Sequence, residues 1–386
     1  MKRIGYGRQE ILDCDIQAVV DVLKSDYLTQ GPKISEFEDV VADYHNAEYA
    51  VAFCNGTAAL HACYSAIGVS KGDEVITSAI TFAASMNGAL YENATPVICD
   101  IDPQTNCIDV DEVSKNITSK TKAVCPVSFA GYPCDLKKIR EVVGNEIFIV
   151  HDAAHAIGSK RGNSFGLEYA DLAILSFHPV KHITTGEGGM VLTNNKELYE
   201  KLMLFRTHGI TKNPEELKRK NEGKWYHEMQ SLGYNYRMCD IQATLGIEQF
   251  KRMESNLHNR NKVAKKYNEE FAKLDWIKTP PTFDLSWVDS NVTSDDLNSY
   301  HLYTILVDKS IREEFFNYLH ENGIMVQVHY LPIHMHPYYQ ETFGMDKLSL
   351  PNAESYYEGT ISLPMFHSMS EEEQDYIIEK VKEFRK

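Results

Sequence analysis

The fold is decided by residues 171–193, which read DLAILSFHPVKHITTGEGGMVLT. Two apolar runs, 171–177 and 189–193, enclose a polar, glycine-rich loop that contains Lys181. Short apolar runs bounded by turn residues predict buried strands. Active sites of open α/β sheets gather just past the ends of such strands. A lysine held there is desolvated, which lowers its pKa and frees the amine to form a Schiff base, whereas most lysines are solvated surface charges.

The same alternation extends on both sides of this stretch. Apolar runs alternate with amphipathic segments from about residue 48 to 205, which predicts a mostly parallel sheet covered by helices on both faces. The predicted strands are 49–53, 74–78, 96–99, 123–128, 147–151, 172–177 and 190–193, and the predicted helices are 57–67, 82–91, 110–117 and 136–143.

A smaller α+β unit is predicted after this part. A long helix is expected at 240–259, and 259–274 either continues it or follows a kink. The polar segments 211–230 and 279–299 are expected to be loops. Beyond them the pattern predicts a strand at 303–307, a helix at 311–322, a strand at 325–329 and a last helix opened by a capping box of Ser370 and Glu373.

Length and charge restrict the class of protein. A chain of 386 residues exceeds what one hydrophobic core usually carries, so two domains are expected. A net charge of -16 argues against nucleic acid or an anionic membrane as the main partner. The first residues lack the apolar core of a signal peptide, and no apolar run is long enough to span a bilayer, so a cytoplasmic location is expected.

A turn of small residues follows the first predicted strand. It reads Cys54-Asn55-Gly56-Thr57-Ala58 and opens a helix. Backbone N–H groups at a helix N-terminus bind phosphate, and Thr57 adds a hydroxyl donor. An ordinary strand-to-helix turn capped by Asn or Thr has the same pattern.

Two other strand ends carry a carboxylate and an aromatic ring. Asp152 emerges from an apolar run, and a buried carboxylate needs a cationic or N–H partner such as a protonated pyridine nitrogen. Phe82 follows another strand and offers a face on which a flat ring can stack. The alternatives are a helix N-cap for Asp152 and an ordinary core aromatic for Phe82. Together with Lys181 and the small-residue turn, these groups supply the four contacts that pyridoxal 5′-phosphate requires.

With these residues in place, the chain resembles the sugar aminotransferases of the DegT/DnrJ/EryC1/StrS group over essentially its whole length. The resemblance is carried by segments 56–60, 152–155, 176–181, 186–189 and 233–237. It implies the fold type I, aspartate aminotransferase-like architecture. The implied division is an N-terminal segment at 1–30 that joins the active site and the small domain, a large cofactor-binding domain at 31–250 and a small C-terminal domain at 251–386.

The resemblance also implies roles for individual residues. Lys181 carries the cofactor, Asp152 pairs with the ring nitrogen, His155 lies beside the ring oxygen, and Asn235 reaches the phosphate of a neighbouring subunit, which implies a homodimer. Asn55 stands where the family usually has Ser, and Leu331 where close relatives have Lys. The expected cofactor contacts are Gly56, Thr57, Ala58, Phe82, Asp152, His155, Ser176, Lys181 and Asn235, and the expected substrate contacts are Tyr6, Asp26, Tyr27, Leu28, Thr29, Asn55, Arg237, Val328, His329, Tyr330 and Leu331.

The implied reaction is transfer of an amino group from L-glutamate to C4 of a UDP-linked 4-keto-6-deoxy-N-acetylhexosamine. Segments 27–31, 178–185, 301–303 and 327–332 are most similar to the branch of pseudaminic acid synthesis. The alternatives are a nucleotide-sugar 3- or 4-aminotransferase of the perosamine or N-acetylbacillosamine type, and a non-catalytic regulator that binds the cofactor. A sugar dehydratase of the same fold has histidine in place of the cofactor lysine, whereas Lys181 is present here.

Three histidines suggest one further alternative, a metal site. His329, His334 and His336 lie close in sequence, and imidazoles bind transition metals. No carboxylate or cysteine stands near them in the sequence, so no metal is expected.

Overall fold

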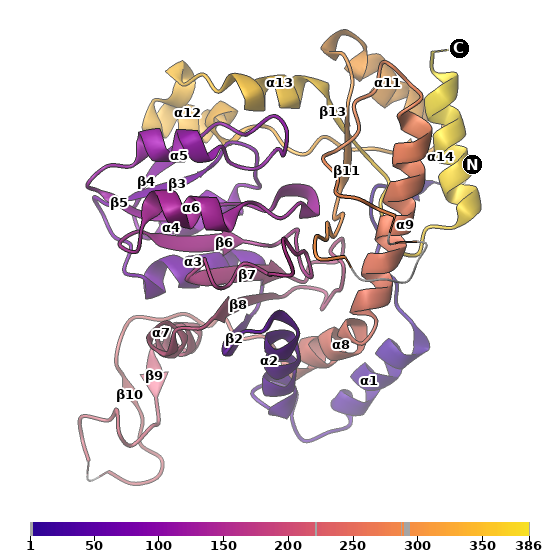
Figure 1. Cartoon of the computed structure of the whole chain (residues 1–386). Helices are drawn as coiled ribbons and strands as arrows, with labels where there is room; N and C mark the ends of the chain where they lie inside the picture. Colours follow the sequence, from indigo (N-terminus) through magenta and orange to yellow (C-terminus); the bar gives the residue numbers. More distant parts are fainter. Residues whose placement is uncertain (1–2, 221, 287, 289–293, 386) are drawn as a thin grey trace.

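A seven-stranded sheet forms the centre of the first part of the chain (Figure 1). This computed structural model describes residues 3–220, 222–286, 288 and 294–385. The strand order is β2-β8-β7-β6-β5-β3-β4, and β8 runs antiparallel to both of its neighbours while the other pairs are parallel, which confirms the predicted mostly parallel sheet. The strands are β2 (Tyr49–Phe53), β3 (Glu74–Ser78), β4 (Thr95–Cys99), β5 (Thr121–Cys125), β6 (Phe148–Asp152), β7 (Leu172–Ser176) and β8 (Gly189–Thr193).

Helices cover both faces of this sheet. Successive side chains of a strand point to opposite faces, so Val150 of β6 packs in one apolar cluster and Ile149 in another. The face of Val150 is covered by α3 (Gly56–Ala66), α4 (Ala84–Tyr91) and α7 (Lys196–Arg206). The opposite face is covered by α2 (Pro32–His45), α5 (Val110–Asn116), α6 (Leu136–Val143) and α8 (Asp240–Phe250).

The C-terminal part has its own apolar cluster. β11 (Tyr303–Leu306) pairs antiparallel with β13 (Thr360–Leu363), and helices α9 (Met253–Phe271), α11 (Lys309–Glu321) and α14 (Glu371–Glu383) pack beside them. The N-terminal strand β1 (Ile4–Gly5) joins this part by pairing in parallel with β12 (Ile324–Met325). The predicted capping box of α14 is confirmed, because Ser370 Oγ accepts from the Glu373 N–H and Glu373 Oε2 accepts from the Ser370 N–H, each at 3.1 Å.

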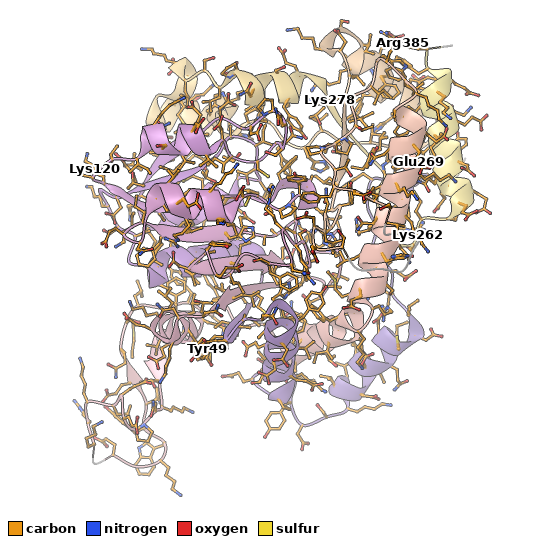
Figure 2. The ribbon with its side chains drawn as sticks, viewed as in Figure 1. Tyr49, Lys120, Lys262, Glu269, Lys278 and Arg385 are labelled. Carbon is orange, nitrogen blue, oxygen red and sulfur yellow. The ribbon has the colours of Figure 1, made fainter. Side chains whose placement is uncertain are left out.

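Helix α9 belongs to both parts. Its residues Met253 and Leu257 lie in an apolar cluster of the sheet, whereas Tyr267 and Phe271 lie in the C-terminal cluster. Lys262 and Glu269 of α9 are exposed to solvent (Figure 2), whereas Arg260 and Asn261 of the same helix are buried. We propose that the domain boundary predicted at residue 251 lies at the start of this shared helix.

Three sequence-based predictions are wrong in their extent. The strand expected at 123–128 begins at Thr121 and ends at Cys125. The helix expected at 240–259 is interrupted after Phe250, and Arg252, at the break, donates to Asp15 at 2.8 Å. The strand expected at 325–329 is limited to Ile324–Met325, because its partner β1 is only two residues long. Residues 287 and 289–293 of the loop expected at 279–299 lie outside the described residues.

Some elements had no counterpart in the sequence-based prediction. They include a hairpin of two-residue strands at the ends of the segment 211–230, several helices before and after the sheet, and one strand of the C-terminal part. The hairpin strands are β9 (Ile210–Thr211) and β10 (Glu228–Met229), the helices are α1 (Asp13–Leu23), α2, α7, α12 (Pro337–Phe343) and α13 (Pro351–Gly359), and the strand is β13. None of the helices in the described part is long and apolar enough to cross a bilayer.

Candidate active site

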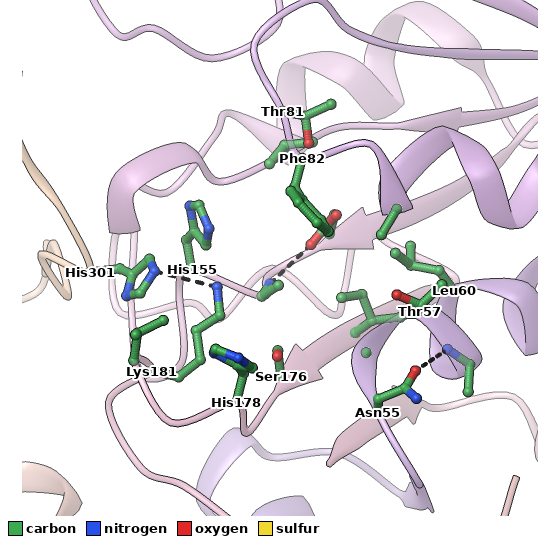
Figure 3. Close-up of a pocket in the computed structure, with 18 of the residues that line it drawn as sticks. Asn55, Thr57, Leu60, Thr81, Phe82, His155, Ser176, His178, Lys181 and His301 are labelled. Atoms are coloured by element: carbon green, nitrogen blue, oxygen red, sulfur yellow. Dashed lines mark hydrogen bonds between the residues drawn. The ribbon is translucent and has the colours of Figure 1, made fainter. Parts of the chain in front are cut away.

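The carboxyl ends of the parallel strands open into one cavity of about 690 Å³ (Figure 3). Loops after β2, β3, β6 and β7 supply most of its wall, and residues near 301 and 330 close it from the C-terminal part. Of the residues singled out in the sequence, this cavity brings together Tyr6, Asn55, Gly56, Thr57, Ala58, Phe82, Asp152, His155, Ser176, Lys181, His329 and Tyr330.

One end of the cavity is formed by residues 55–58 and Ser176, which we call the cradle. Helix α3 begins at Gly56, and Asn55 caps it by accepting the Ala58 N–H on Oδ1 at 2.8 Å. The N–H groups of Gly56 and Thr57 belong to the first helical turn and have no partner within the helix. A side chain at Gly189 would come within 2.5 Å of the Asn55 carbonyl oxygen, so only glycine lets β8 approach this turn. The cradle thus offers amides and two hydroxyls to an anion.

Asp152 lies at the end of β6 and is 5% exposed. Its Oδ2 accepts from Ser85 Oγ at 2.6 Å, and its Oδ1 accepts from the Ala154 N–H at 3.0 Å. Burial raises the pKa of this carboxyl, while the two hydrogen bonds and the nearby Lys181 oppose that rise. No lysine, arginine or histidine of the described residues forms an ion pair with Asp152. A buried carboxylate without such a partner fits a cationic ligand.

Lys181 lies in the loop after β7, at the other end of the cavity. Its Nζ is 3.3 Å from Nε2 of His301. Part of the side chain borders the cavity, but the surrounding protein removes most water from the amine, and this desolvation lowers the pKa of Lys181 to about 7. The charge of Asp152 opposes the shift, and that of Arg260 adds to it. An amine with this pKa is partly uncharged near neutral pH and is therefore a nucleophile.

His155 and Tyr330 form a hydrogen-bonded pair with defined polarity. Nδ1 of His155 accepts the Ala130 N–H at 3.3 Å, and Nε2 lies 3.2 Å from the Tyr330 hydroxyl. Burial holds the pKa of His155 well below its ordinary value, so the ring is neutral and its one proton is on Nε2. Nε2 therefore donates to the Tyr330 oxygen, and the hydroxyl proton of Tyr330 is left to donate to a ligand in the cavity.

His301 lines the same cavity but was not among the predicted site residues. It is 4% exposed and lies 120 positions from Lys181 in the sequence. No local motif signals a contact over such a separation. His178, Glu187 and Tyr236 also line the cavity without having been predicted.

Eight of the predicted residues do not line this cavity. Tyr27 and Leu28 are 56% and 46% exposed on the surface beside α1, and Asn235 is exposed as well. The predicted residues that are absent from the cavity wall are Asp26, Tyr27, Leu28, Thr29, Asn235, Arg237, Val328 and Leu331.

The three histidines considered as metal ligands have separate surroundings. Nδ1 of His329 is 2.8 Å from Ser362 Oγ, while Nε2 of His334 is 3.2 Å from Glu354 Oε1. Within the described part of the chain, no group of three or more His, Cys, Asp or Glu residues is placed to hold a metal ion.

Known proteins resemble this chain over its full length. The model of the DegT/DnrJ/EryC1/StrS aminotransferase family matches residues 9–382. The spore coat polysaccharide biosynthesis protein SpsC of Bacillus subtilis is 38% identical over 378 residues, covering 96% of this chain and 94% of that protein. A UDP-4-amino-4,6-dideoxy-N-acetyl-beta-L-altrosamine transaminase of Campylobacter jejuni is 36% identical over 393 residues, covering 98% of each chain.

Solved structures agree with these matches. PseC of Helicobacter pylori, an aminotransferase involved in pseudaminic acid biosynthesis, superposes with a TM-score of 0.89 at 30% identity and 99% coverage of both chains. The PLP form of the sugar aminotransferase Spr1654 of Streptococcus pneumoniae superposes with a TM-score of 0.88 at 31% identity, covering 99% of this chain and 98% of that one.

The residues of the cavity fit pyridoxal 5′-phosphate. The carboxylate of Asp152 has no cationic partner within the described residues, and a protonated ring nitrogen would be such a partner. The cradle offers hydrogen-bond donors to a phosphate, and Lys181 offers an amine to an aldehyde. The chain belongs to the DegT/DnrJ/EryC1/StrS aminotransferase family, and its cofactor is pyridoxal 5′-phosphate.

Proposed function

We propose that this aminotransferase moves an amino group from L-glutamate to C4 of a UDP-linked 4-keto-6-deoxy-N-acetylhexosamine. The proposal is carried by one observation: the desolvated amine of Lys181 and the buried carboxylate of Asp152 line a single cavity at the strand ends. The sugar is inferred from the Campylobacter jejuni transaminase, whose likeness covers 98% of both chains.

Six of the cavity residues have a proposed task in this reaction. Bound pyridoxal phosphate withdraws electrons from the α-carbon of the amino donor. Asp152 keeps a positive charge on the ring nitrogen, and Thr57 and Ser176 donate to the phosphate. Lys181 removes the proton from the donor α-carbon as a general base and later returns a proton as a general acid. The hydroxyl of Tyr330, oriented by His155, donates to an oxygen of the bound substrate.

We also propose that the active form is a homodimer. Monomers rarely expose large contiguous apolar patches, yet exposed apolar side chains gather along α1 and the segment that follows it. Asn235 does not line the cavity of its own chain, which suits a contact with a second copy. The exposed apolar residues near α1 are Ile11, Leu12, Ile16, Leu23, Tyr27 and Leu28, and Trp225, Met229 and Leu232 are exposed near the β9–β10 hairpin.

The test is a direct substrate comparison. The purified enzyme is incubated with L-glutamate and UDP-linked 4-keto-6-deoxy-N-acetylhexosamines of both C5 configurations, with the perosamine precursor and a 3-keto sugar nucleotide in parallel. We expect stoichiometric release of 2-oxoglutarate with one UDP-linked 4-keto sugar and, by NMR of the product, an amine on C4. Preference for the perosamine precursor, or an amine on C3, contradicts the proposed substrate.

A further inference from the structure

The amine of Lys181 has one hydrogen-bond partner among the described residues. That partner is Nε2 of His301, at 3.3 Å, and Figure 3 shows the contact across one end of the cavity. Asp152, whose charge also acts on the amine, bonds instead to Ser85 and Ala154. The direction in which Lys181 presents its lone pair therefore depends on His301.

His301 is held rigidly by its backbone and its ring. The guanidinium of Arg260, which is 0% exposed, donates to the carbonyl oxygens of Tyr300, His301 and Met365 at 2.9, 3.4 and 3.2 Å. The ring of His301 lies against that of His155, with centroids 4.3 Å apart. Arg260 of α9 thus holds the backbone of His301, and the rings of His155 and His182, the latter with its centroid 5.6 Å away, restrict the imidazole.

The surroundings keep this imidazole neutral. Burial depresses the pKa of His301 well below its ordinary value, and the neighbouring Lys181, His155, His182 and Arg260 each oppose a further positive charge. A neutral ring has one nitrogen that accepts and one that donates. Nδ1 of His301 has no hydrogen-bond partner among the described residues, so within them the imidazole makes one hydrogen bond, the one with Lys181.

We propose that His301 is a positioning residue for Lys181: its Nε2 accepts one N–H of the amine and thereby turns the lone pair of that amine toward the cavity. The inference rests on the proposed role of Lys181 as the base. An uncharged amine has two N–H bonds and one lone pair. Holding one N–H on a fixed acceptor confines the lone pair to a narrow range of directions.

The proton balance leaves His301 unchanged through the reaction. When Lys181 acts as base, a new N–H bond forms on Nζ, the Cα–H bond of the donor breaks, and its electron pair would be accepted by the bound cofactor. Lys181 then carries one positive charge, and in the second step it would give this proton to the carbon of the cofactor that carried the aldehyde, which returns Nζ to its uncharged form. Throughout, His301 keeps its own proton on Nδ1 and keeps the same N–H of Lys181 on Nε2.

The experiment compares His301→Phe with His301→Gln, because the amide oxygen of glutamine restores an acceptor and phenylalanine does not. The matched control is His45→Phe, since His45 is also 4% exposed but lies between Phe165 and Phe250, away from the cavity. Two rates are measured: capture of pyridoxal phosphate by the cofactor-free protein, followed by visible absorbance, and the first half-reaction with glutamate or α-deuterated glutamate.

We expect His301→Phe to slow both rates by about 100-fold, the loss typical of a misplaced reacting group, and to raise the α-deuterium isotope effect because proton transfer becomes slower. His301→Gln is expected to recover at least about tenfold of that loss, and His45→Phe to leave both rates unchanged.

If a folded His301→Phe protein, verified by its melting curve, shows normal capture and a normal isotope effect, the inference is wrong. If His301→Phe does not fold, the two rates of His301→Gln are compared with those of His301→Ala. Equal rates in these two variants would also show that the inference is wrong. The proposed function fails separately, when Lys181→Ala keeps its activity.

Discussion

The two ends of the active-site cavity are built in different ways. The cradle consists of four consecutive residues and Ser176, and most of its donors are backbone amides or hydroxyls at the start of α3. The lysine end consists of side chains from distant parts of the chain, namely Lys181, His301 and His155, with Arg260 behind them. One end is thus made by local backbone geometry and the other by tertiary packing.

This difference predicts different responses to mutation. In the cradle several weak hydrogen-bond donors are expected to bind the phosphate together, so the loss of one leaves the others in place. At the lysine end each side chain has a separate task, and the removal of one has no substitute nearby. We therefore expect large effects at the lysine end and small ones at the cradle.

The largest effect is expected for Lys181→Ala. The variant loses both the amine that holds the cofactor and the base, so turnover should fall by at least about 10⁴-fold, with loss of the visible absorbance band of the cofactor–lysine linkage. Lys196→Ala, at an exposed lysine of α7, is the control and should be unaffected. Full activity in Lys181→Ala would falsify the proposed function.

A second effect is expected in the pH dependence of cofactor capture by the cofactor-free protein. Burial lowers the pKa of Lys181 from 10.5 to about 7, so the uncharged, reactive amine dominates above about pH 7 and is lost as the pH falls through that value. Near neutral pH this makes about 10³ times more free amine than an ordinary lysine has. The capture rate should rise up to about pH 7 and then level off, and a rate that still rises steeply above pH 9 contradicts this assignment.

A third, smaller effect is expected for Asp152→Asn. The substitution keeps the shape but removes the charge that holds a proton on the ring nitrogen. A charge-assisted hydrogen bond is worth about 1.5–3 kcal/mol, which corresponds to a loss of about 10- to 150-fold in the rate of the first half-reaction. Stopped-flow absorbance with L-glutamate measures it, and Asp135→Asn at the cap of α6 is the control. An unchanged rate excludes the proposed pairing.

The smallest effect is expected for Ser176→Ala in the cradle. One hydroxyl donor to the phosphate is lost while Thr57 and the amides remain, so the affinity for pyridoxal phosphate should fall by about tenfold, with little change in the rate of the first half-reaction. Equilibrium dialysis of the cofactor measures the change, and Ser255→Ala on the exposed side of α9 is the control. A loss as large as that of Lys181→Ala removes the proposed contrast between the two ends.

The cradle end could be located at a strand end from the sequence because its pattern is local, and its binding of a phosphate stays a prediction. The run from β2 through Gly56 into α3 is continuous, and the apolar run before Asp152 marks a strand end. The strands of the sheet were found for the same reason, since each is a short apolar segment between turns. The helix from 240 was expected to be continuous, yet it is interrupted near Arg252, whose guanidinium donates to Asp15, a residue that lies 237 positions earlier.

The lysine end was predicted only in part. Lys181 stood out by its place in a glycine-rich loop, whereas the contact with His301 and the carbonyl contacts of Arg260 depend on how the C-terminal part packs against the sheet. Substrate contacts expected at 26–29 do not line this cavity, and nothing in their local pattern distinguishes a wall of the cavity from the surface of α1.

Helix α9 links the apolar core of the C-terminal part to the position of His301 beside Lys181. Tyr267 and Phe271 of its last turns pack against Tyr303, and Met253 of its first turn packs in an apolar cluster of the sheet. Between them, Arg260 donates to the backbone carbonyl of His301. A shift of the helix along its axis would therefore be transmitted to the imidazole beside Lys181. Substitutions deep in the C-terminal core, far from any ligand, would then alter the reactivity of the amine while leaving every wall residue of the cavity in place.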